Sequence, residues 1–151
     1  MNIRLRHTLA IIFLVAAVAV SACTLHPSPQ AKQSGENHPA PTWPDTMDAV
    51  IAAPENHKIL LENDRVRVLE VTLKPHEKEP LHGHRWASVM YIDKSGDFRD
   101  FDSQGKVLFD SRTVKTPIQY PVTQWQEPQA PHAVENLSDK AVHLIRVELK
   151  K

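Results

Sequence analysis

Two histidines separated by a single residue, His82 and His84, most plainly suggest chemistry in this chain. In a β-strand the side chains of residues i and i+2 point to the same face, so both imidazoles would face one way. A third imidazole, His132, could close another side of the same site from a different strand. Because neutral imidazole is the commonest protein ligand of metals, the sequence predicts one divalent metal ion, with Fe, Mn, Zn, Ni and Cu all open.

The residues around the histidine pair offer further candidates. Glu77 and Glu79 precede the pair in a segment rich in Lys, Glu and Pro, where we expect a solvated loop, although a carboxylate could reach back to a metal. Arg85 follows the pair and could either bind an anion at a cavity rim or form a surface ion pair. His143 lies in a strongly apolar segment, which predicts a core histidine or a hydrogen-bond partner of a ligand. We expect four other histidines to lie outside the site: His7, His26, His38 and His57.

The elements that must position these side chains are short strands. Alternating or β-branched apolar segments, separated by turns, predict strands at 57–62, 65–74, 81–84, 87–93, 98–101, 107–111, 119–125, 132–137 and 141–149. The fifth and sixth of these should form a hairpin around a loop that contains glycine. No long helical period appears, so we expect an all-β sandwich or barrel. Three aromatic residues could line its cavity or simply pack in its core: Tyr91, Tyr120 and Trp125.

The first 22 residues have the pattern of a secretion signal. Arg4 and Arg6 precede an uninterrupted apolar run from Leu9 to Val20, which is too short to span a bilayer. The run leads to Cys23, the only cysteine of the chain, so this region resembles the signal peptide and lipobox of bacterial lipoproteins. That resemblance implies a lipid on Cys23 and a place in the cell envelope. Since Thr24 follows the cysteine, it implies the periplasmic face of the outer membrane in a Gram-negative cell.

The rest of the chain divides into a tether and one domain. Residues 23–53 begin with a proline-rich polar stretch that cannot bury enough apolar surface to order itself, so we expect a disordered spacer. A short helical turn at 45–53, capped by Asp45 and ended by Pro54, should close it. Residues 54–151 then form the β-domain. With Cys23 lipidated no disulfide is available, and the domain must be stabilised by its packed core.

The charge balance argues against two classes of partner. The chain has 18 basic and 18 acidic residues, and removal of residues 1–22 with Arg4 and Arg6 leaves a charge of about −2. This balance does not favour nucleic-acid binding, and the absence of a Lys/Arg cluster argues against electrostatic docking on a membrane. We therefore expect contact with the membrane only through the lipid anchor.

Two stretches of the chain resemble the two short motifs of the cupin superfamily. The first motif has a Gly, then His-x-His, a Glu and a second Gly; here His82, His84 and Gly96 match, His76 stands at the first Gly, and Val89 or Ser88 replaces the Glu. In the second motif His132 and Asn136 match, Gln129 stands at the Gly, and the proline is displaced to Pro128. The resemblance, with the strands between, covers residues 57–150.

The resemblance implies a double-stranded β-helix, or jelly-roll barrel, with a metal site in its mouth. The carried-over ligands are His82, His84 and His132, while Asn136 is expected to be structural. Without the Glu, three neutral imidazoles leave the charge of a dication uncompensated, which favours an anionic substrate or hydroxide at the open positions.

Three functions fit this resemblance, and the sequence leaves them open. The first is a metal-dependent enzyme acting on a small molecule, such as a three-histidine dioxygenase, an isomerase or a lyase. The second is a non-enzymatic accessory lipoprotein that captures a small ligand or a metal with a degenerate site. The third is a structural barrel that forms a homodimer through its edge strands.

Overall fold

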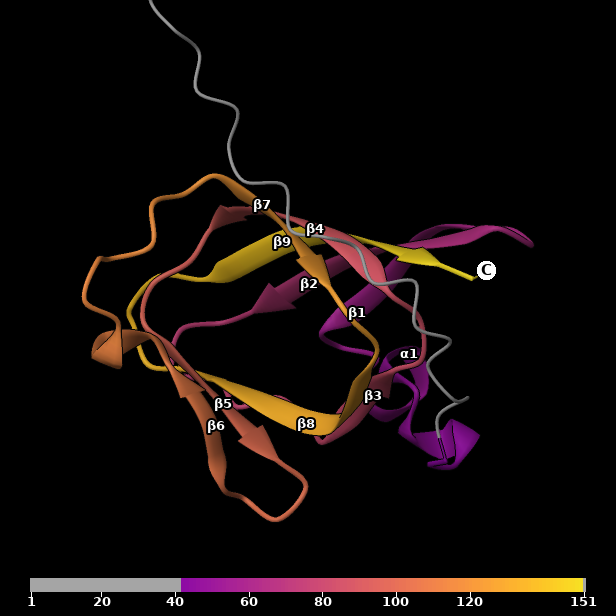
Figure 1. The fold of residues 1–151 in the computed structure, drawn as a ribbon, viewed down its shortest axis with the longest axis horizontal. Coiled ribbons are helices and arrows are strands. Elements are labelled where there is room, and N and C mark those ends of the chain that lie inside the picture. The colour runs from indigo at the N-terminus through magenta and orange to yellow at the C-terminus, as the bar shows by residue number, and fades with distance from the viewer. Residues whose placement is uncertain (1–41, 151) are drawn as a thin grey trace, which may run out of the picture. The chain divides into compact units, whose positions relative to one another are not determined.

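Two antiparallel sheets face each other in the computed structural model, which describes residues 42–150 (Figure 1). The first sheet has the order β1 (His57–Glu62), β2 (Val66–Leu73), β9 (Val142–Leu149), β4 (Ser88–Lys94) and β7 (Val122–Gln126). The second has the order β3 (His82–His84), β8 (Gln129–Asn136), β5 (Phe98–Asp102) and β6 (Val107–Asp110). All nine expected strands are present within a few residues of their predicted bounds, including the β5–β6 hairpin. The predicted signal peptide, Cys23 and residues 23–41 of the tether lie outside the described residues.

The strands of the first sheet set up a change of polarity across its inner face. On β2 the buried residues alternate strictly, because side chains alternate between the two faces of a strand. Leu73 pairs with Val142 of β9 at one end of the ladder, and Arg67 pairs with Glu148 at the other. The inner face is therefore apolar at one end and charged at the other.

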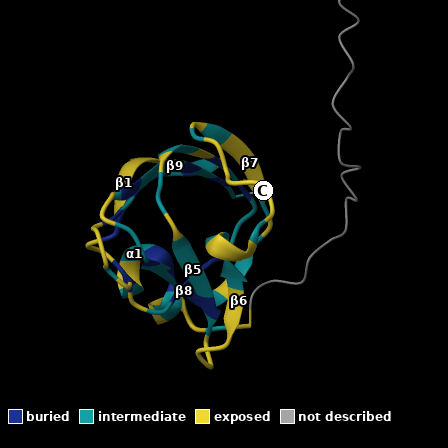
Figure 2. Cartoon of the chain, turned by 90° about the vertical axis from the view of Figure 1, so that its left-hand side faces the viewer, coloured by how far each residue is buried: buried dark blue, intermediate teal, exposed yellow. Residues whose placement is uncertain are grey.

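Alternate residues of β4 extend this pattern across the sheet. Ile92, in the apolar half, lies opposite Leu144 of β9, while Met90 lies opposite Arg146. The apolar core is formed by Leu69, Val71, Leu73 and Val142, against which Val50, Val134 and Leu144 pack. Figure 2 shows dark-blue buried stretches on β8 and beside α1, whereas much of β6 is exposed.

The segment before the first strand packs against the barrel. A short 3-10 helix, η1 (Asp45–Met47), leads into a single helical turn, α1 (Ala49–Ala52). The side chain of Asp48, not the expected Asp45, caps this turn by accepting a hydrogen bond from the Val50 N–H. Ala49 and Ala53 are fully buried, so this part of the segment assigned to the tether belongs to the packed unit that includes the barrel. Within residues 42–150 no helix is long and apolar enough to cross a bilayer.

Two backbone positions near the histidine pair have special requirements. His76, which stands where the first motif has a glycine, has a φ of 59°, a left-handed conformation that favours glycine. Gly83, between the two histidines, lies against the indole ring of Trp43: a Cβ atom there would be 2.7 Å from the ring carbon Cζ2. The absence of a side chain at residue 83 therefore lets Trp43 cover the outer side of β3.

Candidate metal centre

Four buried imidazoles gather at one end of the barrel. His57 begins β1, His82 and His84 begin and end β3, and His132 lies on β8, and each of the four residues is at most 6% exposed. The ring centroid of His82 lies 4.4 Å from that of His57, 5.1 Å from that of His84 and 4.7 Å from that of His132. The antiparallel register places His82 directly opposite His132, which explains how two residues 50 positions apart in the sequence become neighbours.

Three of these histidines form a cluster that could hold a metal ion. One ring nitrogen each of His57, His82 and His84 lies within 4.8 Å of the others. His132, the third ligand predicted from the sequence, is in the same group of rings, with its centroid 5.9 Å from that of His84. The Nε2 atom of His132 is buried and has no hydrogen-bond partner. The described site thus contains the predicted trio and one further imidazole.

His57 was expected to lie outside the site, and the structure corrects this. Only the first residue of β1 is buried, because β1 is an edge strand whose later residues, including Ile59 and Leu60, are exposed. The N–H of His57 donates to the carbonyl of Ala53, so α1 and the following turn direct the ring inward. The HKILLE sequence carries no alternation that would reveal this, since its central apolar residues face solvent.

All four rings are oriented through their Nδ1 atoms. The acceptors are the carbonyl of Ala53 for His57 at 3.2 Å, the carbonyl of Pro80 for His82 at 2.9 Å, Glu148 for His84 at 2.7 Å and Asp100 for His132 at 3.0 Å. Only a protonated nitrogen can donate to such oxygens, so each neutral ring carries its hydrogen on Nδ1. The lone pair on each Nε2 is therefore available to a metal. The oxygens that accept from Nδ1 are carbonyls and carboxylates, the same kinds of group that orient metal-binding histidines in other proteins.

Burial keeps three of the rings neutral. Desolvation is the main reason why the pKa of His57 falls to about 4 and that of His82 to about 2; Arg146 and the neighbouring imidazoles act in the same direction, and the backbone hydrogen bonds to Ala53 and Pro80 oppose it. The pKa of His84 is also well below its usual value, again mainly through desolvation. Uncharged imidazoles are the form that binds metal ions, so these rings need not lose a proton near neutral pH.

A buried carboxyl group also faces the cluster. Glu79 is 4% exposed, which corrects the expectation of a solvated loop. Its backbone N–H donates to the Val134 carbonyl, and its Oε1 accepts from the Val134 N–H, so β8 fixes the residue in place. Oε1 lies 3.8 Å from Nε2 of His82, while Oε2 is buried without a partner. Desolvation raises the pKa of Glu79 to about 8.

The positions that replace the motif's glutamate supply no carboxylate. Ser88 is fully buried on β4, and its Oγ has no hydrogen-bond partner, while the neighbouring Val89 is partly buried. Glu79 enters from the segment before β3 instead. The sequence signal that could have favoured this residue is its position three residues before His82, next to Pro80, which supplies the carbonyl acceptor of that ring.

His84 contacts a network of four buried charged residues, which are Asp48, Arg67, Arg146 and Glu148. Arg67 donates to both oxygens of Asp48, at 2.9 and 3.2 Å, and to Glu148 at 2.5 Å. The other oxygen of Glu148 accepts from His84, and Nε of Arg146 lies 3.8 Å from the same oxygen. All four charged side chains are at most 8% exposed. The pKa of Glu148 is raised mainly by desolvation, which Arg67 opposes.

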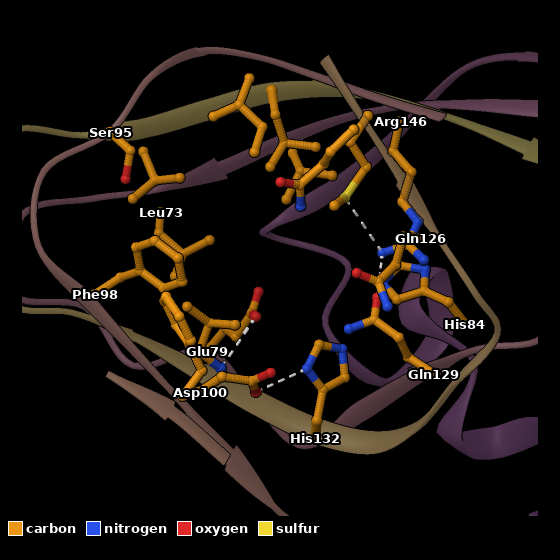
Figure 3. Close-up of a pocket in the computed structure, with 18 of the residues that line it drawn as sticks. Leu73, Glu79, His84, Ser95, Phe98, Asp100, Gln126, Gln129, His132 and Arg146 are labelled. Atoms are coloured by element: carbon orange, nitrogen blue, oxygen red, sulfur yellow. Dashed lines mark hydrogen bonds and ion pairs between the residues drawn. The ribbon is translucent and has the colours of Figure 1, made fainter. Parts of the chain in front are cut away.

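The imidazoles lie at one end of a cavity of about 390 Å³ between the two sheets. In Figure 3, His84, Gln129 and Arg146 lie at one side of this cavity, and Leu73 and Phe98 lie at the other. Polar groups at the first end include Gln124, Gln126, Gln129 and Arg146, and the apolar lining includes Ile92, Phe98, Phe109, Ile118 and Leu144. The cavity can therefore take a molecule with one polar and one apolar end.

The other candidate residues have different locations. Tyr120 lines the cavity, whereas Tyr91 and Trp125 are each 48% exposed and do not line it. Arg85 forms an ion pair with Asp45 and stacks on Trp43, which is the alternative that the sequence analysis left open for this residue. Asn136 donates to the carbonyls of Leu73, Lys74 and Lys140 and is 1% exposed, as expected for a structural role.

His143 is on the outer face of β9. Its neighbours in the strand, Val142 and Leu144, line the cavity, so the ring of His143 points away from it. There the ring is hydrogen-bonded to Asp93 and Glu70. It is neither a core histidine nor a partner of the four imidazoles.

Of the comparisons with known proteins, only the one with solved structures found a match, and it supports the fold. No family model matches the chain, and no curated protein matches it. Among solved structures, it is similar to a cupin domain from Bordetella pertussis, with 21% identity, a TM-score of 0.51, and coverage of 63% of this chain and 92% of that one. A cupin family protein from Methanocaldococcus jannaschii is 11% identical, with a TM-score of 0.46 and coverage of 62% and 77%. Together with the two antiparallel sheets, the first likeness shows that the chain has the double-stranded β-helix fold of the cupin superfamily.

Proposed function

We propose that this barrel binds one divalent metal ion and uses it to act on a small molecule in the cavity. His82 and His84 would hold the metal together with His57 and His132. The observation that carries this proposal is the common orientation of the four rings, each of which donates from Nδ1 to a fixed oxygen. The unpartnered Nε2 of His132 supports it further, because a buried polar atom is normally satisfied.

The ligand atoms of the proposed site are compatible with all five metals predicted from the sequence. Imidazole nitrogens suit Fe, Ni, Cu and Zn, and a nearby carboxyl such as Glu79 extends the set to Mn. Four imidazoles would fill a tetrahedral zinc site, so a metal that also admits substrate would need more than four coordination positions. When bound, such an ion supplies a Lewis acid with open positions for a substrate.

The chain's own residues would orient the substrate and handle protons. The apolar half of the cavity would bind the body of the molecule and exclude water. Glu79, with an unpartnered Oε2, would be the group that holds a proton beside the reacting end. This arrangement supports the reaction classes expected from the resemblance, which are those of a dioxygenase, an isomerase or a lyase.

The metal content of the purified protein tests the proposal. After chelation and reconstitution with Fe(II), Mn(II), Ni(II), Cu(II) or Zn(II), mass spectrometry should find about one ion per chain for the preferred metal. The double variant His82→Ala/His132→Ala should retain close to none, and His57→Ala should bind more weakly. His143→Gln is the matched control, because it removes an imidazole from the outer face and should leave binding unchanged. Equal, near-zero metal in the wild type and the double variant would disprove the proposal.

A thermal-shift screen separates this function from capture of a ligand without metal. In the proposed function the preferred metal alone raises the melting temperature, because it binds only the folded site. Stabilisation by metal-free ligands, with no effect of any metal, would instead favour the accessory role. In that case the proposed metal-dependent reaction would have no support.

We further propose that the protein is a lipoprotein of the cell envelope. The support is the sequence pattern of Arg4, Arg6, the apolar run and Cys23. Mass spectrometry of the N-terminal peptide should find a diacylglyceryl group on Cys23, and Cys23→Ser should release the protein from membranes. An unmodified Cys23 in membrane-free protein would contradict this proposal.

A further inference from the structure

Arg146 is the buried cation of the cavity that lacks a hydrogen-bonded carboxylate. Its Nη1 donates to Oε1 of Gln129 at 2.7 Å, but Nε and Nη2 are buried and have no hydrogen-bond partner. The side chain is 3% exposed and lines the cavity. Burying a guanidinium group without hydrogen-bond partners costs free energy of folding. A ligand that accepted hydrogen bonds from Arg146 would reduce this cost.

Two of the carboxylates near Arg146, those of Asp48 and Glu148, are already engaged, and the third, Glu79, lines the same cavity but makes no hydrogen bond to Arg146. Asp48 and one oxygen of Glu148 accept from Arg67, and the other oxygen of Glu148 accepts from His84. Nε of Arg146 lies 3.8 Å from that second oxygen, which is an ion pair without a hydrogen bond. Glu148 therefore compensates part of the charge of Arg146 but does not satisfy its donors.

Arg146 remains a cation in this setting. Desolvation lowers its pKa to about 10, and the nearby Glu148 opposes that shift. The planar guanidinium matches a planar carboxylate, which can accept two parallel hydrogen bonds from it. Gln124 and Gln126 of β7 also line the cavity, and Gln124 lies opposite Met90, which lies opposite Arg146, so the amide groups are at the same end.

The length and the apolar lining of the cavity beyond Arg146 restrict the part of the ligand that lies away from its charged head. Along β9 the inward residues run from Arg146 through Leu144 to Val142, a distance of about 13 Å for four residues of strand. Beyond the cation the lining becomes apolar, with Phe98 and Phe109 on the facing sheet. A ligand that fills this space has a single anionic head and an apolar tail.

We infer that the cavity binds a small monocarboxylate, with its head on the guanidinium group of Arg146 and its apolar tail between the sheets. The inference rests on the proposed function in treating this cavity as the substrate site, but it does not require the metal.

Calorimetry on the metal-free protein tests the inference with octanoate and octanamide, which share shape and tail but differ in charge. The wild type should bind octanoate about 10-fold to 100-fold more tightly, the range expected for a charged hydrogen bond. Arg146→Met should abolish this preference. Arg112→Met, which removes an exposed arginine paired with Asp110, is the matched control and should keep it.

A second variant tests the same contact in case Arg146→Met does not fold. Gln129→Glu is isosteric and would place a carboxylate on Nη1 of Arg146, so it should weaken octanoate binding while the barrel stays folded. Equal affinity of the wild type for acid and amide would overturn the inference, as would a preference for octanoate that is undiminished in either variant. Because chelated protein is used, a preference for octanoate supports the inference even if the protein binds no metal and the proposed function fails.

Discussion

Glu148 accepts a hydrogen bond of 2.7 Å from Nδ1 of His84, although 64 residues separate the two in the sequence. Neither side chain is more than 2% exposed. The same carboxylate is held by Arg67, so the orientation of a candidate metal ligand depends on a buried ion pair between β2 and β9. This link connects the stability of the barrel to the chemistry of its site.

Replacing Glu148 with Gln should weaken metal binding and destabilise the fold. The amide removes the charge that holds Arg67 and orients His84, and loss of such a partner typically lowers metal affinity about 10-fold to 100-fold. Competition with a chelating dye measures the affinity, and urea unfolding of the metal-free protein measures stability. Glu62→Gln, at an exposed ion pair with Lys150, is the control and should change neither. Wild-type metal affinity in Glu148→Gln would show that the hydrogen bond to His84 has no such role.

Asn136→Ala should destabilise the barrel without removing a metal ligand. Its side chain joins the carbonyls of Lys74 and Lys140 and accepts from Ser138, so the variant leaves several buried groups unpaired. The expected loss in the free energy of unfolding is about 2 to 4 kcal/mol, from the cost of unsatisfied buried polar groups. Denaturant unfolding measures this loss, and the metal stoichiometry of the folded fraction should stay unchanged. A loss of metal at full stability would instead assign Asn136 to the metal site.

Gly83→Ala should destabilise the chain through Trp43 rather than through the histidines. The new Cβ would lie 2.7 Å from the indole carbon Cζ2, closer than such atoms approach, so the ring must move. In the background of Trp43→Ala the same substitution should cost much less. A double-mutant cycle measured by thermal unfolding gives this coupling. Additive effects of the two substitutions would contradict a direct contact.

His143 should make stability depend on pH above the ordinary pKa of histidine. Its hydrogen bond to Asp93, aided by Glu70, raises the pKa of the ring above 6.5 in the folded protein, while Lys58 and Lys94 lie beside these two carboxylates. The protonated ring therefore contributes stability that is fully present below the unfolded pKa and lost as pH rises through the folded pKa.

Urea unfolding at pH 6 and pH 9 measures this contribution. His143→Gln should be less stable than the wild type at pH 6, and the difference should shrink at pH 9. Asp93→Asn should show the same trend, because it removes the main partner of the ring. A difference between wild type and His143→Gln that is the same at both pH values would rule out this linkage.

The sequence by itself determined the strands and therefore the fold. Alternation on β2 and β9 is strong because one face of each strand is buried, and the His82–His84 spacing is sufficient to place two imidazoles on one face. His132 could be added by the motif resemblance. Asn136 could be recognised as structural for the same reason, since its position within a family motif is visible without coordinates.

Only the tertiary structure decided what surrounds those histidines. His57, Glu79 and Arg146 enter the cavity from an edge strand, a loop and a long strand, and their local sequences are those of exposed or core segments. Strand pairing and the packing of α1 bring them together across 22 to 89 residues of chain, and such long-range contacts leave no local pattern. The charge of the site is therefore a property of the folded barrel, because desolvation and pairing across sheets set it.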